Sequence, residues 1–123
     1  TKAYRADLRN GTFMIARGGW YGDYGDPMTF LELSETGNGN NDRGYSDAGY
    51  DGLLERARDM TDAVGRMELL HEAEHKVVVQ DLPIMPVYHF TTTYLYDPTR
   101  LRGLTRHPRL QQEYWRLERV SGE

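Results

Sequence analysis

An acidic side chain, Asp23, follows a large aromatic side chain, Trp20, by three positions in a segment that is rich in glycine (residues 18–25). A carboxylate beside an indole ring suits a small cationic group such as an ammonium. The neighbouring glycines have no side chain, so they let the backbone approach a ligand closely. The pattern therefore indicates a binding site for a positively charged group more than a catalytic site.

Two neighbouring residues extend this candidate site. The guanidinium of Arg17 can hold a ligand carboxylate through two hydrogen bonds, or it can pair with an acid of the same loop. The backbone around Tyr21 can bond to an extended ligand in the manner of an added strand. Asp26 stands directly before Pro27 and is better placed than Asp23 to cap a helix that begins at the proline. This placement leaves Asp23 for another partner.

The elements that must position these residues follow from the apolar pattern. Residues 13–16 predict a short buried strand, because they are apolar and bounded by glycine-containing turns. Residues 27–33 predict a short helix, and residues 34–45 predict a long polar loop. Asp23 would then lie in a strand-to-helix connection, where α/β proteins often place ligand contacts.

Two longer helices are predicted next, at about 48–60 with Ser46 as the N-cap and at about 62–80 with Thr61 as the N-cap. Pro83 ends the second one. Each carries an apolar stripe at helical spacing, which indicates core packing more than a cofactor site. The stripes are Tyr50, Leu53, Leu54 and Ala57 in the first helix and Val64, Met67, Leu70, Ala73, Val77 and Val78 in the second.

The remaining residues predict more strand than helix. Residues 91–96 are β-branched and aromatic, and residues 113–120 alternate weakly. Residues 1–10 read as the end of a surface helix that runs into a turn at Asn10 and Gly11. The order strand, helix, helix, helix, strand, strand predicts an α/β fragment with few strands of its own.

A five-residue motif in the second long helix offers a different chemistry. His71, Glu72 and His75 match the H-E-x-x-H pattern of zinc hydrolases, in which two histidines one turn apart bind the metal and the glutamate acts as a base. A catalytic zinc site needs a third protein ligand. Val78 and Asp81 occupy positions where a longer form of the motif has glycine and histidine. We favour the simpler interpretation, in which the two histidines are variable surface residues of an ordinary helix.

Composition narrows the class of protein. The chain has 123 residues, a formal net charge of −4 and no cysteine, which fits one small domain and excludes disulfides and thiolate metal sites. Basic residues are interspersed with acidic ones, so the sequence shows no basic cluster of the kind that binds nucleic acid. Neither a long apolar run nor a signal peptide is found. Because the chain begins at Thr1 without an initiator methionine, we expect an excised fragment or a processed product.

The ordered motifs resemble one family, the oligopeptide- and dipeptide-binding proteins of bacterial ABC importers, which have the periplasmic binding protein type II fold. The similarity covers about residues 9–103. It is carried first by Arg17, Gly19, Trp20, Asp23, Tyr24, Asp26, Pro27, Phe30 and Leu31, then by Gly39–Asp42, Gly44–Ser46, Tyr50, Asp51, Leu53, Leu54 and Ala57, and last by Thr61, Asp62, Arg66, Leu70, Ala73, Glu74 and Leu82–Tyr88. Several blocks in the family's order are far more specific than one.

The resemblance implies a two-lobed protein that closes over its ligand, of which residues 1–123 are a C-terminal fragment. About residues 9–90 would belong to the second, peptide-binding lobe, and about residues 91–123 would return to complete the first. In the family, the aspartate matching Asp23 pairs with the α-ammonium of the peptide. Arg17 would assist with a carboxylate, Trp20 would shield the ion pair, and the region of Tyr21 would offer backbone bonds.

The resemblance also implies the partners and the compartment. They are a short peptide ligand, the membrane subunits of an ABC permease and the remainder of the parent protein, in the periplasm or elsewhere outside the cytoplasm. No cofactor, bound metal, catalytic residue or nucleic-acid partner is expected. Related binders capture sugars, opines or nickel complexes, and these ligands stay open as alternatives. The isolated fragment can also self-associate through surfaces that the missing lobe would cover.

Overall fold

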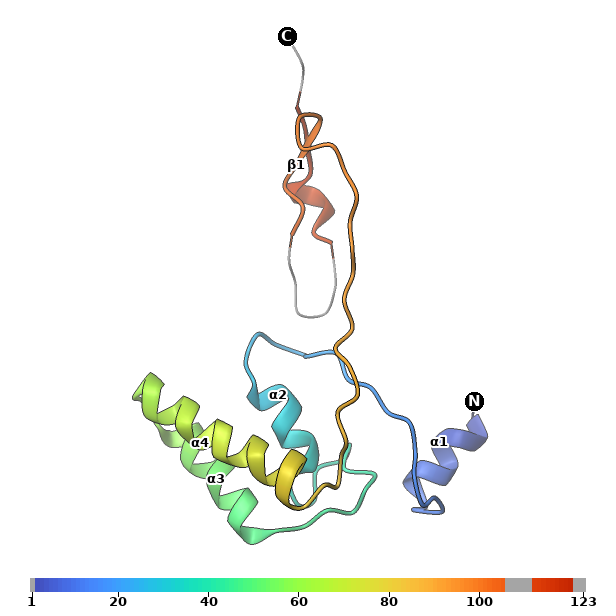
Figure 1. Cartoon of the computed structure of the whole chain (residues 1–123), viewed down its shortest axis with the longest axis vertical. Helices are drawn as coiled ribbons and strands as arrows, with labels where there is room; N and C mark the ends of the chain where they lie inside the picture. The colour runs from blue at the N-terminus through green and yellow to red at the C-terminus, as the bar shows by residue number, and fades with distance from the viewer. Residues whose placement is uncertain (1, 106–111, 121–123) are drawn as a thin grey trace. The chain divides into compact units, whose positions relative to one another are not determined.

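A computed structural model describes residues 2–105 and 112–120, whose elements are mostly helical (Figure 1). Their order is α1 (Lys2–Arg9), α2 (Met28–Leu31), the 3₁₀ turn η1 (Glu32–Ser34), α3 (Ala48–Asp59), α4 (Ala63–His75), the π-helical turn η2 (Lys76–Gln80), β1 (Leu101–Arg102), the 3₁₀ turn η3 (Tyr114–Arg116) and β2 (Glu118–Arg119). They form two compact units. The first unit is Thr1–Trp20 with Asp26–Pro86, and the second is Tyr21–Gly25 with Val87–Glu123.

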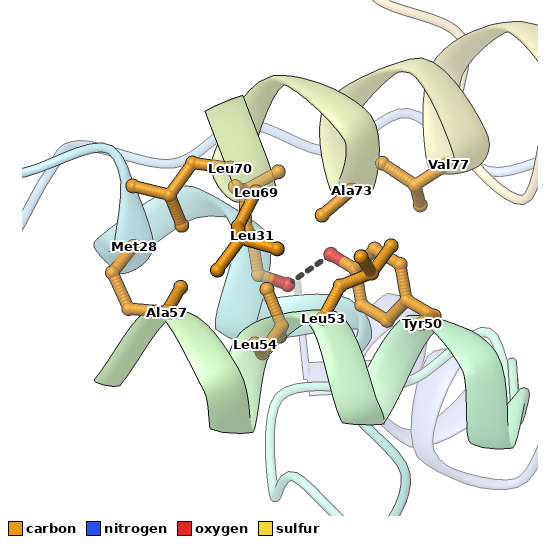
Figure 2. Close-up of a cluster of buried hydrophobic side chains, with 10 residues drawn as sticks. All are labelled: Met28, Leu31, Tyr50, Leu53, Leu54, Ala57, Leu69, Leu70, Ala73 and Val77. Carbon is orange, nitrogen blue, oxygen red and sulfur yellow. Dashed lines mark hydrogen bonds between the residues drawn. The ribbon is translucent and has the colours of Figure 1, made fainter. Parts of the chain in front are cut away.

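The core of the first unit lies where α3 packs along α4 and α2 covers their junction (Figure 2). The predicted stripe of α3 is confirmed, since all four of its residues are buried. In α4 the buried residues are Leu69, Leu70 and Ala73, followed by Val77 in η2. Val64 is 69% exposed and Met67 is 36% exposed, so the places of both in the predicted stripe are wrong. Successive residues turn by about 100°, which puts Val64 on the side away from Leu70 and Ala73.

A buried hydrogen bond fixes α2 on α3. The hydroxyl of Tyr50, whose side chain is fully buried, donates to the backbone carbonyl of Leu31 at 2.6 Å, as Figure 2 shows. Burial raises the pKa of this hydroxyl, so it stays protonated and keeps donating. The predicted helix at 27–33 is confirmed as α2 continued by η1.

The caps of the two long helices each lie one residue later than predicted. Asp47, not Ser46, accepts a hydrogen bond from the backbone N–H of Tyr50 at 2.7 Å. Asp62, not Thr61, accepts from the backbone N–H of Gly65 at 2.7 Å. Serine, threonine and aspartate are all good N-caps, so the sequence alone does not choose between neighbours.

The strand predictions for 13–16 and 91–96 are wrong for the structure as described. Met14 is 95% exposed, Ile15 is 88% exposed, residues 14 and 15 form a bend, and neither segment pairs with another in the described ranges. A strand needs a neighbour that supplies hydrogen bonds. Among the described residues the one sheet joins β1 and β2 as an antiparallel pair, with Leu101 opposite Arg119. The prediction for 113–120 is confirmed where β2 lies, although a 3₁₀ turn precedes it.

The other elements agree with expectation. Residues 2–9 form a surface helix with no buried residue, and the turn after it places Gly11 at a φ of 63°. The second long helix runs on through η2 to Gln80, before Pro83. Residues 103–109 are rich in basic side chains and predict a loop, of which residues 106–109 lie outside the described residues. No helix in the described ranges is long and apolar enough to cross a membrane.

Candidate functional site

The four predicted site residues lie in one exposed connection between α1 and α2, and the division into units falls inside it. Arg17 and Trp20 belong to the first unit, and Tyr21 and Asp23 to the second. All four are exposed, with Trp20 at 36% and Tyr21 at 49%. Arg17 and Asp23 each take part in at least one interaction. The four side chains that the sequence predicts to bind a ligand are therefore accessible to solvent, two in each unit.

The upstream end of the connection is attached to α1. The hydroxyl of Tyr4 donates a hydrogen bond to the backbone carbonyl of Arg17. This bond holds the backbone at Arg17 while its guanidinium stays at the surface. The first helix thus positions the residue that was predicted to meet a carboxylate.

The downstream end is attached more firmly, through Asp26. Its carboxylate accepts from the backbone N–H of Met28 at 2.9 Å, so the predicted capping role is confirmed. The same carboxylate receives two hydrogen bonds from the guanidinium of Arg66, at 2.7 and 2.9 Å. Arg66 in turn donates from Nε to the carbonyl of Ala57 at 3.1 Å. The Arg66 hydrogen bond, followed by the Met28 N–H, lowers the pKa of Asp26 below its usual range.

The second unit, which contains Asp23, also holds an aromatic cluster. The ring of Tyr21 stacks on Phe90 at 5.5 Å between centroids, with 26° between the planes. Phe90 meets Tyr88 edge to face at 5.0 Å and 70°. Offset stacking and edge-to-face contacts are the favoured arrangements of aromatic rings. Asp23 follows Tyr21 by two positions in the same unit, so the candidate acid and one ring of the cluster share a short stretch of chain.

The sequence interpretation missed Phe90 and assigned Tyr88 no binding role. The sequence did contain a sign of this cluster. Tyr88 and Phe90 lie two positions apart in a segment predicted to be extended, so their side chains should project from the same face. Their contact with Tyr21 could not be read from that spacing, since it joins distant parts of the chain. The placement of Arg17 and Trp20 around Asp23 stays a prediction.

A hollow of about 400 Å³ lies elsewhere in the first unit. Its lining combines apolar and charged side chains, and none of the four predicted residues takes part. The lining residues are Gly11, Phe13, Met14, Asp42, Arg43, Tyr45, Leu82 and Pro83. No residue of the loop at 17–27, which the motifs single out, lines this hollow.

The histidines of the H-E-x-x-H pattern are exposed on α4, His71 in its last two turns and His75 at its end. Across residues 2–105 and 112–120, no three side chains of histidine, cysteine, aspartate or glutamate come together to hold a metal ion. A third protein ligand, which a catalytic zinc site requires, is thus not found in that part of the chain.

Comparison with known proteins finds no matching family model. It does find peptide-binding relatives. The oligopeptide-binding protein OppA of Bacillus subtilis is 37% identical over 102 residues, which are 82% of this chain and 18% of the relative. The dipeptide-binding protein DppE of the same organism is 34% identical over 96 residues, 78% of this chain and 17% of the relative.

Two further comparisons bear on fold and on ligand. The crystal structure of a periplasmic oligopeptide-binding protein from Borrelia burgdorferi superposes with a TM-score of 0.72 and 30% identity, over 96% of this chain and 24% of that one. A probable deoxycholate-binding periplasmic protein, YgiS of Escherichia coli, is 33% identical over 97 residues, 79% of this chain and 18% of the relative.

These findings confirm the predicted fold class, because the chain has the structure of part of a periplasmic oligopeptide-binding protein. The chain spans less than a quarter of the length of each of these proteins. Over most of its length it is therefore homologous to one portion of the oligopeptide- and dipeptide-binding proteins, the family that its motifs resemble.

Proposed function

We propose that this chain is part of a solute-binding protein that captures short peptides outside the cytoplasm for import by an ABC transporter. The observation that carries the proposal is its similarity to an oligopeptide-binding and a dipeptide-binding protein over about four fifths of its residues. The fold match to a periplasmic oligopeptide-binding protein supports the same compartment and ligand class. The partners would be the peptide, the permease subunits and the remainder of the parent protein.

Asp23 anchors the peptide ammonium in this proposal. Its carboxylate lies at the surface in the same unit as the stacked rings of Tyr21 and Phe90. Aromatic faces attract cations and shield them from water, which strengthens an ion pair. Trp20 adds an exposed indole three positions upstream, and Arg17 receives a carboxylate of the ligand.

The backbone near Tyr21 contributes bonds that do not depend on the peptide's side chains. Every peptide presents the same N–H and C=O groups, and extended ligands commonly add a strand to an exposed edge. The exposed segments at 17–21 and 85–97, which lie outside helices and strands, are described parts of the chain with backbone available for such bonds. Such contacts allow one site to accept varied sequences.

The lobes predicted from the family remain part of the proposal. About residues 9–90 would belong to the second lobe and about 91–123 to the returning segment of the first. The compact units divide between Pro86 and Val87, close to that boundary, although the second unit also takes in Tyr21–Gly25. Closure of two lobes over a ligand would desolvate it and present a closed form to the permease.

We also propose that the chain has no catalytic role. Its relatives are named for binding, and the described part of the chain offers His71 and His75 no third metal-binding side chain. The zinc-hydrolase alternative predicts peptide cleavage that depends on zinc and is abolished by Glu72→Gln. A cleavage assay with the purified chain and zinc separates the two functions.

A ligand other than a peptide is the second candidate, because a relative at 33% identity is a probable deoxycholate-binding protein. Calorimetric titration of the complete parent protein distinguishes the candidates. Free peptides of two to five residues should bind, whereas deoxycholate, sugars and nickel complexes should not. Binding of one of these solutes in the absence of any peptide binding would contradict the proposed ligand class.

A further inference from the structure

The histidines of α4 stand one helical turn apart on the exposed side of the helix. His71 and His75 are both exposed, and residues four apart on a helix are neighbours with about 5–6 Å between their Cβ atoms. Two histidines at this spacing on one face are a known arrangement for holding a metal ion. The proposed function uses neither of them.

The helix offers the two imidazoles a firm frame. The opposite face of α4 is anchored in the core by Leu70 and Ala73, which are 1% and 0% exposed, and Figure 2 shows both turned toward α3. With about 100° per residue, His71 and His75 point away from this face. Because the frame is already ordered, the entropy cost of bringing the imidazoles together is small.

The charges along this helical run also favour a cation. The two lysine and arginine side chains between residues 63 and 80 are held by acids, Arg66 by Asp26 and Lys76 by Asp47 and Asp81. Lys76 lies 2.9 Å from Asp81 and 3.4 Å from Asp47. These ion pairs neutralise the basic side chains of the run.

The acids beside the histidines have the opposite effect. Glu68 stands three positions before His71 and Glu72 three positions before His75, and both glutamates are exposed. Residues three apart lie on the same side of a helix, so their carboxylates raise the negative potential around the imidazoles.

We propose that His71 and His75 form a two-histidine site for a divalent cation of the zinc, nickel and copper class. Imidazole nitrogen is a preferred ligand of these ions, whereas magnesium prefers oxygen. Water completes the coordination, because the described residues supply no group of three candidate ligands. The site is a surface chelate and does not depend on the peptide-binding proposal.

The test is calorimetric titration of the purified chain with zinc, alongside the variants His71→Ala and His75→Ala. Wild type should bind one zinc ion per chain, and each variant should bind at least about tenfold more weakly, a loss of about 1.4 kcal/mol, because one arm of the chelate is gone. His89→Ala, which removes an exposed histidine outside α4, is the matched control and should bind as wild type does. Magnesium should not bind.

A second measurement separates binding to the folded helix from binding to an unfolded chain. Zinc should raise the thermal unfolding temperature of wild type and of His89→Ala, and it should leave the two α4 variants unchanged. Circular dichroism confirms that each variant keeps its helix, which alanine favours. Equal zinc affinity in wild type, His71→Ala and His75→Ala would overturn the proposal, as would a wild type that binds no zinc.

Discussion

At the scale of single residues, the carboxylate of Asp26 joins three helices of the first unit. It caps α2 at Met28, receives the guanidinium of Arg66 from α4, and through Arg66 reaches the carbonyl of Ala57 in α3. Both side chains are less than a third exposed, so this pair is better protected from solvent than a typical surface salt bridge. Its position fixes the end of the candidate binding loop.

We predict that Asp26 and Arg66 are energetically coupled. Asp26→Ala should lower the free energy of unfolding by about 1–3 kcal/mol, because a cap and a charged hydrogen bond are both lost. In a double-mutant cycle with Arg66→Ala, urea unfolding should give a coupling of about 0.5–3 kcal/mol. Strict additivity of the two substitutions would show that the pair contributes nothing.

The same pair sets a pH dependence. The pKa of Asp26 is lowered in the folded chain, first by the Arg66 hydrogen bond, so the ionised carboxylate is the stabilising form. Its contribution is complete above the usual aspartate pKa of about 4 and is lost as the pH falls through the lowered value. The stability difference between wild type and the Asp26→Asn variant should accordingly shrink in acid.

At the scale of elements, the start of α4 depends on Asp62. We predict that Asp62→Ala destabilises the chain by about 0.5–2 kcal/mol, because the backbone N–H of Gly65 loses its acceptor. Thr61→Ala is the matched control one residue away and should change the unfolding free energy by less than about 0.5 kcal/mol. If the threonine variant were the more damaging one, the observed cap assignment would be wrong.

The contact of α2 with α3 depends on the hydroxyl of Tyr50. Tyr50→Phe keeps the buried ring but leaves the carbonyl of Leu31 without its donor. The expected loss of unfolding free energy is about 1–3 kcal/mol, the cost of an unsatisfied buried polar group. Removal of the exposed hydroxyl of Tyr114, which is 75% exposed, provides the control and should have little effect. Equal unfolding midpoints for the two variants would argue against the bond.

The elements also show what the sequence could and could not predict. Helical periodicity identified α3 and most of the buried face of α4, because local spacing decides which side chains share a face. It failed for residues 13–16 and 91–96, where strand formation depends on partners outside the local segment. The same limit applies at the site. Asp26 as a cap was predictable from Pro27, whereas the stacking of Tyr21 on Phe90 was not.

At the scale of the whole molecule, the chain shows many large apolar side chains at its surface. Met14, Ile15 and Leu95 are all more than 85% exposed. The relatives are more than four times longer than the aligned part of this chain. We infer that the remainder of the parent covers these side chains, and that in its absence they favour self-association.

We therefore predict that the isolated 123-residue chain binds peptides much more weakly than the complete parent does. A ligand held between two lobes loses most of its buried contacts when only part of the cleft is present. Parallel calorimetric titrations with one tripeptide should give an affinity for the chain at least about a hundredfold lower, a difference of about 2.8 kcal/mol. Equal affinities would place the whole site within this chain.

The most direct test of the account is the effect of Asp23→Asn in the complete parent, measured by calorimetry with a tripeptide in free and N-acetylated form. The substitution keeps the shape of the side chain and removes its charge. The account predicts that the free peptide binds at least about tenfold more weakly to the variant, a loss of at least about 1.4 kcal/mol. The acetylated peptide, which has no ammonium, should bind both proteins equally. Equal affinity of the free peptide for wild type and variant would contradict the role of Asp23.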